Sequence, residues 1–450
     1  MSTQVRPVQG AARRAAAVVT LLAVAAFLGK EVASGSPLPG VGLGALLVGI
    51  LVLHRQLWLL VPITTVGLVL GSSLFPFAQS SWMLATKFAL MTSVAATALP
   101  SLLEKGRHHR TPIVFAIAFL GLVGLAFVST LYSFAPVVTF QHAGSLLILW
   151  LAVAVAVPLG CERPEDFMRL LRNVGVVAAT VVLVGIWLTF ANALPSSGRF
   201  QGILGNANTI GYFAPILPSL VLMAAHENKR RGLLFMTATV LFIGLLLSGS
   251  RGGLLSAFFG IGVGFAVARN ARRALIVALT SGAVIAGLFA VLDRPLRPVG
   301  EGVLEIGTGS KRLEAWSDGL RLISERPLTG YGFAATPVVF PELRSAGSNL
   351  GRLHNSYLEA AMDLGWPGAV FMVLLGLSGL MAAWRLARTG ANLRPVGAIL
   401  FGGIAGGMME CVFESGLLAA GGLLAFHFWI LVAAAHALRL RARDLSPALP

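Results

Sequence analysis

The feature that most constrains the fold of this 450-residue chain is its number of long apolar runs. A helix of roughly 18 or more apolar residues can cross a hydrocarbon core about 30 Å thick. Some candidates are short or closely spaced, so we expect about 12 (12–14) transmembrane helices. The sequence therefore predicts an all-α integral membrane protein, a polytopic helix bundle, with candidate spans at 11–29, 41–53, 57–75, 84–103, 112–131, 138–158, 173–194, 209–226, 232–249, 252–268, 274–292, 366–387, 396–413 and 417–438.

Positive charges set the expected orientation of these spans. Basic clusters occur at every second connection between predicted spans, among them 104–110, 227–231 and 269–273. Basic loops favour the cytoplasmic side of a membrane. We therefore expect both termini in the cytoplasm and the loops 195–208 and 293–365 on the external side.

The net charge of +16 follows from this topology. Segment 293–365 contains 8 Lys/Arg and 9 Asp/Glu, which sum to −1, so the rest of the chain carries +17. A nucleic-acid-binding protein would need a soluble basic face, and the sequence predicts none. We expect membrane lipids, and no nucleic acid, among the partners.

The two cysteines and the N-terminus predict little chemistry. Cys161 falls in a predicted cytoplasmic loop and Cys411 near the external end of a span, so the two cannot meet. We expect neither a disulfide nor a metal site from them. Arg13 and Arg14 precede an apolar stretch as in a signal sequence, but so many further spans favour an uncleaved first helix.

Glycines spaced by four residues recur in the predicted spans. Small residues at this spacing let helices approach closely in lipid. We interpret them as packing sites, and we find no internal repeat of the kind seen in inverted-repeat transporters. The pairs are Gly260/Gly264, Gly402/Gly406 and Gly403/Gly407.

A long external loop divides the chain into three parts: N-terminal transmembrane helices at 1–292, a largely helical loop domain at 293–365 and C-terminal transmembrane helices at 366–450. Loops of this length are often functional. A second loop helix is expected to begin near His354 and to reach the next span at Trp366. The first is expected to be capped by Ser310 and ended by Pro327 and Gly330, with one face formed by Leu313, Trp316, Leu320 and Ile323.

Two polar clusters lie at predicted external ends of spans. In "GRFQGILGNANTIGYF", Arg199 and two glycines precede Asn206 and Asn208 at a probable helix start, an arrangement that suits an anionic ligand; an ordinary turn is the alternative. In "SGSRGG", Arg251 lies close to the hydrocarbon without a neighbouring acid, which is costly unless it finds a partner. This motif lacks the spacing of a P-loop.

The loop contributes Lys311 and Arg312 at the start of its first helix, where a solvated face is the alternative, and His354 near its end. On a helix, His354 would share a face with Tyr357, while Asn355 and Glu359 would line another. Glu359 is therefore a poor partner for His354 within that helix. We expect the histidine to act alone or with a group from elsewhere.

Taken together, these clusters suggest one kind of chemistry. Arginine matches phosphate oxygens bidentately and stays charged. A diphosphate leaves without a general acid, whereas an attacking sugar hydroxyl gains about 10²- to 10⁴-fold from a positioned base. Histidine is the side chain best suited to that role near neutral pH.

The motifs "GRFQGILGNANTIGYFAPI", "SGSRGG", "GSKRLEAWSDGLRLISERPLTGYGF" and "HNSYLEAAMDLGWPG" resemble, in this order, the O-antigen ligase and O-antigen polymerase superfamily. The resemblance implies a glycosyltransferase in a Gram-negative inner membrane with its active site on the periplasmic side. It further implies transfer of a glycan from undecaprenyl diphosphate to the lipid A–core of lipopolysaccharide, without cofactor, nucleotide or metal. His354 would then be catalytic, and Arg199, Arg312 and, with less motif support, Arg251 would bind the diphosphate.

Several alternatives remain open. An O-antigen polymerase or a protein O-oligosaccharyltransferase would use the same type of donor with another acceptor, and the single long loop favours a ligase modestly. A transporter would place ionisable groups near the bilayer midplane. Only Glu410 and Glu414, one turn apart near the external end of a span, support that reading; they could equally face the acceptor or pair with an arginine.

Overall fold

The computed structural model describes residues 57–75, 78, 80–97, 112–161, 163–191, 200–280, 307–339 and 353–445. Within these ranges the protein is helical and contains no strand beyond an isolated bridge between Ser73 and Leu204. The first helices are α3 (Leu57–Leu70), α4 (Ser81–Ala96), α6 (Ile113–Val128), η2 (Ser129–Leu131), α7 (Pro136–Trp150), η3 (Leu151–Ala156), α8 (Val157–Gly160), α9 (Pro164–Phe190), η4 (Ala207–Phe213) and α10 (Ile216–His226). The remainder are α11 (Arg231–Ser248), α12 (Arg251–Val267), α14 (Gly307–Glu325), α15 (Thr336–Val339), α16 (Ser356–Thr389), α17 (Arg394–Phe413) and α18 (Leu423–Leu445).

The all-helical expectation is confirmed for the described residues, whereas the expected number of spans is not. Seven described helices are long and apolar enough to cross a membrane, or eight if η4 and α10, bent by 43°, form one span. The apolar helices α3 and α12 have 14 and 17 residues and are shorter than the 18 residues required of a span. The predicted spans 11–29 and 41–53 lie outside the described residues, and those at 84–103, 173–194 and 274–292 lie partly outside.

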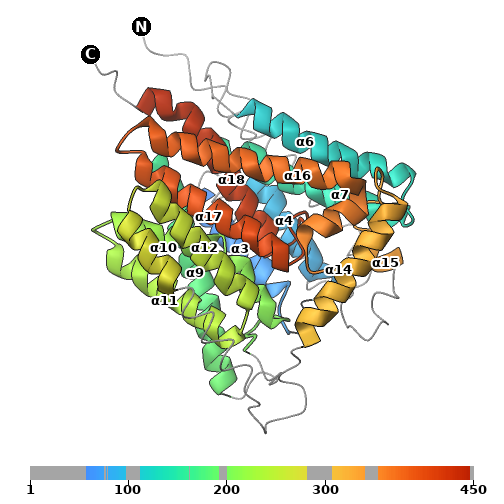
Figure 1. Cartoon of the computed structure of the whole chain (residues 1–450), viewed down its shortest axis with the longest axis horizontal. Helices are drawn as coiled ribbons and strands as arrows, with labels where there is room; N and C mark the ends of the chain where they lie inside the picture. Colours follow the sequence, from blue (N-terminus) through green and yellow to red (C-terminus); the bar gives the residue numbers. More distant parts are fainter. Residues whose placement is uncertain are drawn as a thin grey trace.

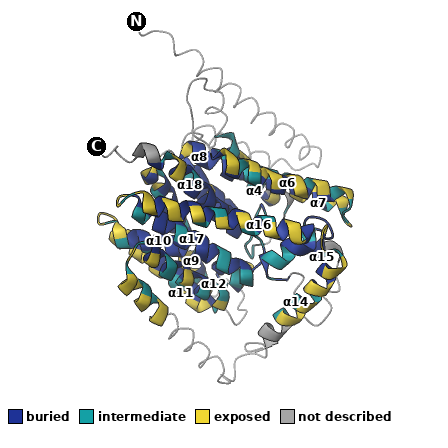
Figure 2. Cartoon of the chain, turned by 45° about the horizontal axis from the view of Figure 1, so that its top comes forward, coloured by how far each residue is buried: buried dark blue, intermediate teal, exposed yellow. Residues whose placement is uncertain are grey.

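The surface of the bundle is suited to lipid. Large apolar side chains are exposed along its outer helices, including Val114 and Ile117 on α6, Trp187 on α9 and Leu374 on α16 (Figure 2). Soluble proteins rarely expose apolar areas of this extent. A helical bundle with such a surface satisfies its backbone hydrogen bonds internally, as a membrane interior requires.

Helices α17 and α18 run through the middle of the bundle, with α9 to α12 on one side and α6, α7 and α16 on the other (Figure 1). The side chains of Phe426, Phe428 and Trp429 on α18 are fully buried. Because α17 is central, the residues at its end are placed by neighbours on several sides.

Glycines form the contact between α12 and α17, as the sequence predicted. A methyl group added to Gly260 would lie 2.5 Å from the carbonyl oxygen of Gly402, and one added to Gly264 would lie 3.2 Å from that of Ala398. The two backbones therefore touch, and the packing role expected for Gly260, Gly264 and Gly402 is confirmed.

The loop helix α14 exists, but two of its predicted details are wrong. It begins at Gly307, so Ser310 lies inside the helix and is not its cap. Its buried side chains include Ala315, Leu322 and Ile323, whereas the predicted core residues Leu313 and Leu320 are 64% and 47% exposed. The buried face is rotated relative to the predicted one because it follows the contact with Leu353, described below.

Helix α16 is broken at Gly365, where φ is +70°. This backbone conformation favours glycine, and a side chain there would also lie 2.5 Å from the carbonyl carbon of Leu328. Pro327, two residues after the end of α14, lies at this break, and its carbonyl accepts a 2.8 Å hydrogen bond from Trp366 N. The segment that follows α14 is thus seated on the kink of α16, which joins the loop to the bundle.

Candidate functional site

Glu414, the residue that follows α17, connects two of the predicted site residues. Its Oε1 accepts a 3.0 Å hydrogen bond from Arg312 Nη2, and its Oε2 lies 3.0 Å from His354 Nδ1. The side chain of Glu414 is only 4% exposed, against 25% for Arg312 and 19% for His354. A carboxylate so buried requires partners, and one arginine and one histidine provide them.

Backbone contacts fix the position of Glu414. Its N–H donates a 2.8 Å bond to the carbonyl of Glu410, which closes the last turn of α17. Its own carbonyl accepts a 2.8 Å bond from Ser356 Oγ, at the first residue of α16. The end of α17 and the start of α16 are therefore tied together, and the carboxylate cannot shift without disturbing both.

His354 precedes α16 and does not belong to it. Asn355 is the N-cap, and its Oδ1 accepts from the N–H groups of Tyr357 and Leu358 at 3.0 and 3.1 Å. His354 itself has φ +47°, a left-handed conformation that is uncommon outside glycine and asparagine. The prediction that His354 shares a helical face with Tyr357 is therefore wrong.

The backbone just before His354 is held by α14. Trp316 Nε1 donates a 2.9 Å bond to the carbonyl of Leu353, and the Leu353 side chain packs against Gly319. Arg312 lies one turn before Trp316 on the same helix. Docking of α14 thus positions both Arg312 and the backbone that leads into His354.

The geometry of His354 suits proton transfer. With Nδ1 directed at a carboxylate, the neutral ring carries its proton there and keeps a lone pair on Nε2. Within the described residues Nε2 makes no hydrogen bond. The carboxylate of Glu414 would also stabilise the imidazolium that forms when Nε2 accepts a proton.

Arg312 retains capacity for an anion. Its guanidinium has five N–H donors, of which the structure assigns one, from Nη2, to Glu414. The side chain is a quarter exposed, so solvent or a ligand reaches it. A cation beside the base is where a departing diphosphate would be stabilised.

The two sequence motifs that precede the loop meet near Glu410, in the last turn of α17. Its carboxyl is fully buried, and neither oxygen has a hydrogen-bond partner among the described residues. A methyl group added to Gly211, in "GNANTIGYF", would collide with Glu410 Oε1 and would lie 3.1 Å from Ser250 Oγ, in "SGSRGG". Both motifs therefore meet the last turn of α17, one turn before Glu414.

The remaining predicted site residues lie as follows. Arg199 lies outside the described residues, and so does the side chain of Lys311. Arg251 is exposed at the first position of α12, next to Gly252, which packs on Phe413 at the end of α17.

The other polar residues that we considered as site candidates, Asn206, Asn208, Asn355 and Tyr357, have local structural contacts. Asn206 caps η4 through a 2.8 Å bond from Asn208 N, as Asn355 caps α16. The Tyr357 hydroxyl donates to the carbonyl of Met408 at 2.7 Å. Glu359 accepts a short hydrogen bond from Ser415 Oγ. The sequence had suggested that Glu359 is a poor partner for His354, and His354 contacts Glu414 instead. The physical reason differs from the predicted one, because His354 lies before the helix and not on another face of it.

Glu414 is the residue that sequence reasoning failed to assign. Its pairing with an arginine was one of the open alternatives, and the structure shows it with Arg312. Its contact with His354, 60 residues earlier in the chain, had no signal in local spacing. The only clue was an acid placed at the external end of a span, where a buried charge needs a partner.

Fold and site together define a polytopic, all-helical membrane protein with a histidine–glutamate–arginine cluster at one end of its central helices. Residues 235–373 match the family model described as O-antigen ligase. The resemblance inferred from the motifs is thus confirmed, and this segment, which contains Arg251, Arg312 and His354, is a domain of the O-antigen ligase family. A search among curated proteins finds no match.

Proposed function

We propose that the protein transfers an O-antigen glycan from undecaprenyl diphosphate to the lipid A–core of lipopolysaccharide on the periplasmic face of a Gram-negative inner membrane. The observation that carries the proposal is the shared carboxylate of Glu414, which joins His354 to Arg312 within a chain that contains an O-antigen ligase domain. The contacts of His354 and Arg312 with one carboxylate support a base that acts next to a phosphate-binding cation.

The reaction would be a direct displacement. Nε2 of His354 takes the proton of an acceptor hydroxyl while the oxygen attacks the anomeric carbon of the donor sugar. The bond from that carbon to the diphosphate oxygen breaks, and its electron pair leaves with the diphosphate. Attack opposite the leaving group inverts the anomeric configuration.

Arginines would stabilise the charge that develops on the diphosphate. The contact of Arg312 with Glu414 supports this role, and Arg251 and Arg199 are the further candidates for the same chemistry. Because these cations neutralise the leaving group, the proposal needs no metal or nucleotide, and transfer should continue in the presence of EDTA.

The test uses the purified full-length protein with a lipid-diphosphate glycan and lipid A–core. Glycan-bearing lipid A–core is the expected product, and His354→Ala should reduce its rate by about 10²-fold or more. His226→Ala, which removes a histidine from the last turn of α10, is the control. Full transfer by a folded His354→Ala protein would exclude the histidine as the base.

An O-antigen polymerase is the second candidate, since the family and the cluster fit the same donor. Incubation with donor alone separates the two. Longer lipid-linked glycans would indicate a polymerase, whereas transfer only in the presence of lipid A–core would indicate a ligase.

A further inference from the structure

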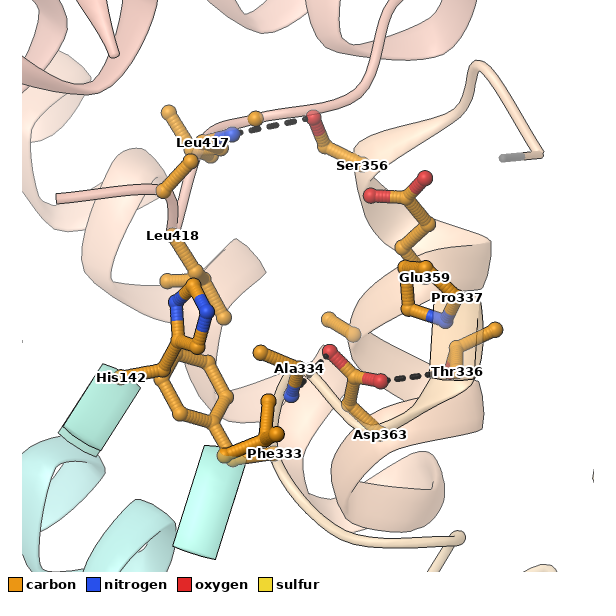
Figure 3. A pocket seen from close by; sticks show the side chains of 14 residues that line it. His142, Phe333, Ala334, Thr336, Pro337, Ser356, Glu359, Asp363, Leu417 and Leu418 are labelled. Atoms are coloured by element: carbon orange, nitrogen blue, oxygen red, sulfur yellow. Dashed lines mark hydrogen bonds between the residues drawn. The ribbon is translucent and has the colours of Figure 1, made fainter. Parts of the chain in front are cut away.

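A pocket of about 210 Å³ lies beside the first turns of α16. It is enclosed by α7, the segment that contains α15, the first turns of α16 and the loop after α17 (Figure 3). Its volume is smaller than the ~300–1,000 Å³ of typical sites for drug-sized ligands. A pocket of this size suits one small ring and not an extended chain.

The pocket combines polar and apolar walls. Glu359 and Asp363 of α16 and His142 of α7 surround the central space, and Phe333, Leu417 and Leu418 complete the wall (Figure 3). Sugars present hydroxyl groups around their edge and apolar C–H groups on their faces. Carboxylates accept hydrogen bonds from the former, and aromatic or aliphatic side chains pack on the latter.

The polar wall is rigid. Asp363 accepts hydrogen bonds from Thr336 Oγ1 at 2.6 Å and from Ala334 N at 2.9 Å. The short bond from Ser415 Oγ to Glu359 holds the second carboxyl group. Groups fixed before a ligand arrives lose little freedom when they bind it.

Two contacts join this pocket to the candidate catalytic cluster. Ser356, which lines the pocket, donates to the carbonyl of Glu414. Ser415, which holds Glu359, is the next residue after Glu414. The pocket and the His354–Glu414 pair are therefore connected through Ser356 and Ser415.

Charge decides which substrate the pocket suits. None of the described residues that line it is lysine or arginine, and two are acidic. Such a wall offers a diphosphate none of the arginine or lysine cations that it needs, whereas Arg312 offers one beside Glu414. The cluster of Arg312 therefore suits the phosphate-bearing donor better than the pocket does.

We propose that this pocket binds one uncharged sugar unit of the acceptor, next to the unit whose hydroxyl is glycosylated. The assignment rests on the proposed glycosyl transfer. Glu359 would accept hydrogen bonds from the hydroxyl groups of this sugar, and Leu417, Leu418 and Phe333 would contact its faces.

The experiment narrows the pocket and measures each substrate separately. Leu418→Trp, from the loop after α17, and Val138→Phe, from α7, fill it from two sides. Each should raise the KM for lipid A–core about tenfold or more, with the KM for the lipid-diphosphate glycan unchanged within about twofold. Leu374→Trp, at an exposed position of α16, is the matched control for a new tryptophan.

A charge variant tests the polar wall. Glu359→Gln keeps an oxygen that can accept from Ser415 but removes the charge, and it should raise the KM for lipid A–core about tenfold. Glu165→Gln, exposed at the start of α9, is its control. A truncated lipid A–core that lacks the sugar unit assigned to the pocket provides a further comparison. The native protein and Leu418→Trp should have the same KM for this truncated acceptor.

The outcomes separate this inference from the function on which it rests. If the native protein transfers no glycan to lipid A–core, the proposed function fails. If the native protein transfers glycan but all three pocket variants, still monodisperse and folded, keep the native KM for lipid A–core, the pocket assignment is wrong. A rise confined to the donor KM would also overturn it.

Discussion

The carboxylate of Glu414 binds the imidazole of His354 and the guanidinium of Arg312 at the same distance, 3.0 Å. One buried acid thus orients the proposed base and holds the cation beside it. The backbone carbonyl of the same residue accepts a hydrogen bond from Ser356 Oγ, so the start of α16, the end of α17 and helix α14 meet at one residue.

Glu414→Gln tests whether this acid supports the base. An amide keeps the size of the side chain but neither fixes the imidazole tautomer nor stabilises the imidazolium, so kcat should fall by about 10²- to 10⁴-fold. The KM for the donor should rise as well, because Glu414 also holds Arg312, whereas the KM for lipid A–core should change little. Glu325→Gln is the control, since Glu325 forms an exposed pair with Arg321 on α14. A kcat within about threefold of native would show that His354 acts without Glu414.

Arg312→Lys and Arg312→Ala test the recognition of diphosphate. Lysine retains the charge but not the planar fork, so the KM for the donor should rise about tenfold in Arg312→Lys and further in Arg312→Ala. Arg321→Ala is the control, because Arg321 lies on the same helix and its side chain is 66% exposed. Direct binding of a lipid diphosphate, measured without acceptor, should show the same order. An Arg312→Ala protein with native donor affinity would remove Arg312 from the site.

Gly260→Ala tests the contact between α12 and α17. The added methyl group would meet the carbonyl oxygen of Gly402 and the ring of Pro218, so we expect a loss of about 1–3 kcal/mol in the free energy of unfolding. Gly124→Ala on α6 meets no atom within 4 Å and should leave the melting temperature unchanged or slightly higher. Equal melting temperatures for the two variants would contradict the close backbone packing.

Single cysteines test the orientation of the loop. Leu313→Cys, exposed on α14, should react with a membrane-impermeant maleimide from the periplasmic side, whereas Lys229→Cys, between α10 and α11, should react only after the inner membrane is opened. The native Cys161 and Cys411 are buried and should remain unlabelled. Labelling of Lys229→Cys in intact cells would reverse the proposed topology.

Much of the described helical framework could be predicted because membrane-spanning helices depend on local composition. The runs at 112–131 and 396–413 correspond closely to α6 and α17. The glycine contacts of Gly260 and Gly402 were also encoded locally, since a four-residue spacing places small residues on one face. The number of spans stays a prediction beyond the described helices.

The site was harder to predict because its contacts join distant segments. The motifs identified Arg312 and His354, but the shared Glu414 depends on how α17 packs beside α16, which no spacing reports. The assumption that His354 belongs to a helix was wrong because the side chain of Asn355, the next residue, caps the start of α16. The face of α14 was misjudged because Leu353, far along the chain, determines which side is buried.

The left-handed backbone of His354 reverses an ordinary rule of substitution. In most helices and extended segments alanine is the more stable replacement and glycine the less stable one. At φ +47° alanine retains a strain of about 1–2 kcal/mol that glycine lacks. Both variants lose the imidazole and should be equally inactive, yet His354→Gly should unfold at a higher denaturant concentration than His354→Ala. The protein thus retains at this position a side chain that the proposed chemistry requires and that the backbone conformation disfavours.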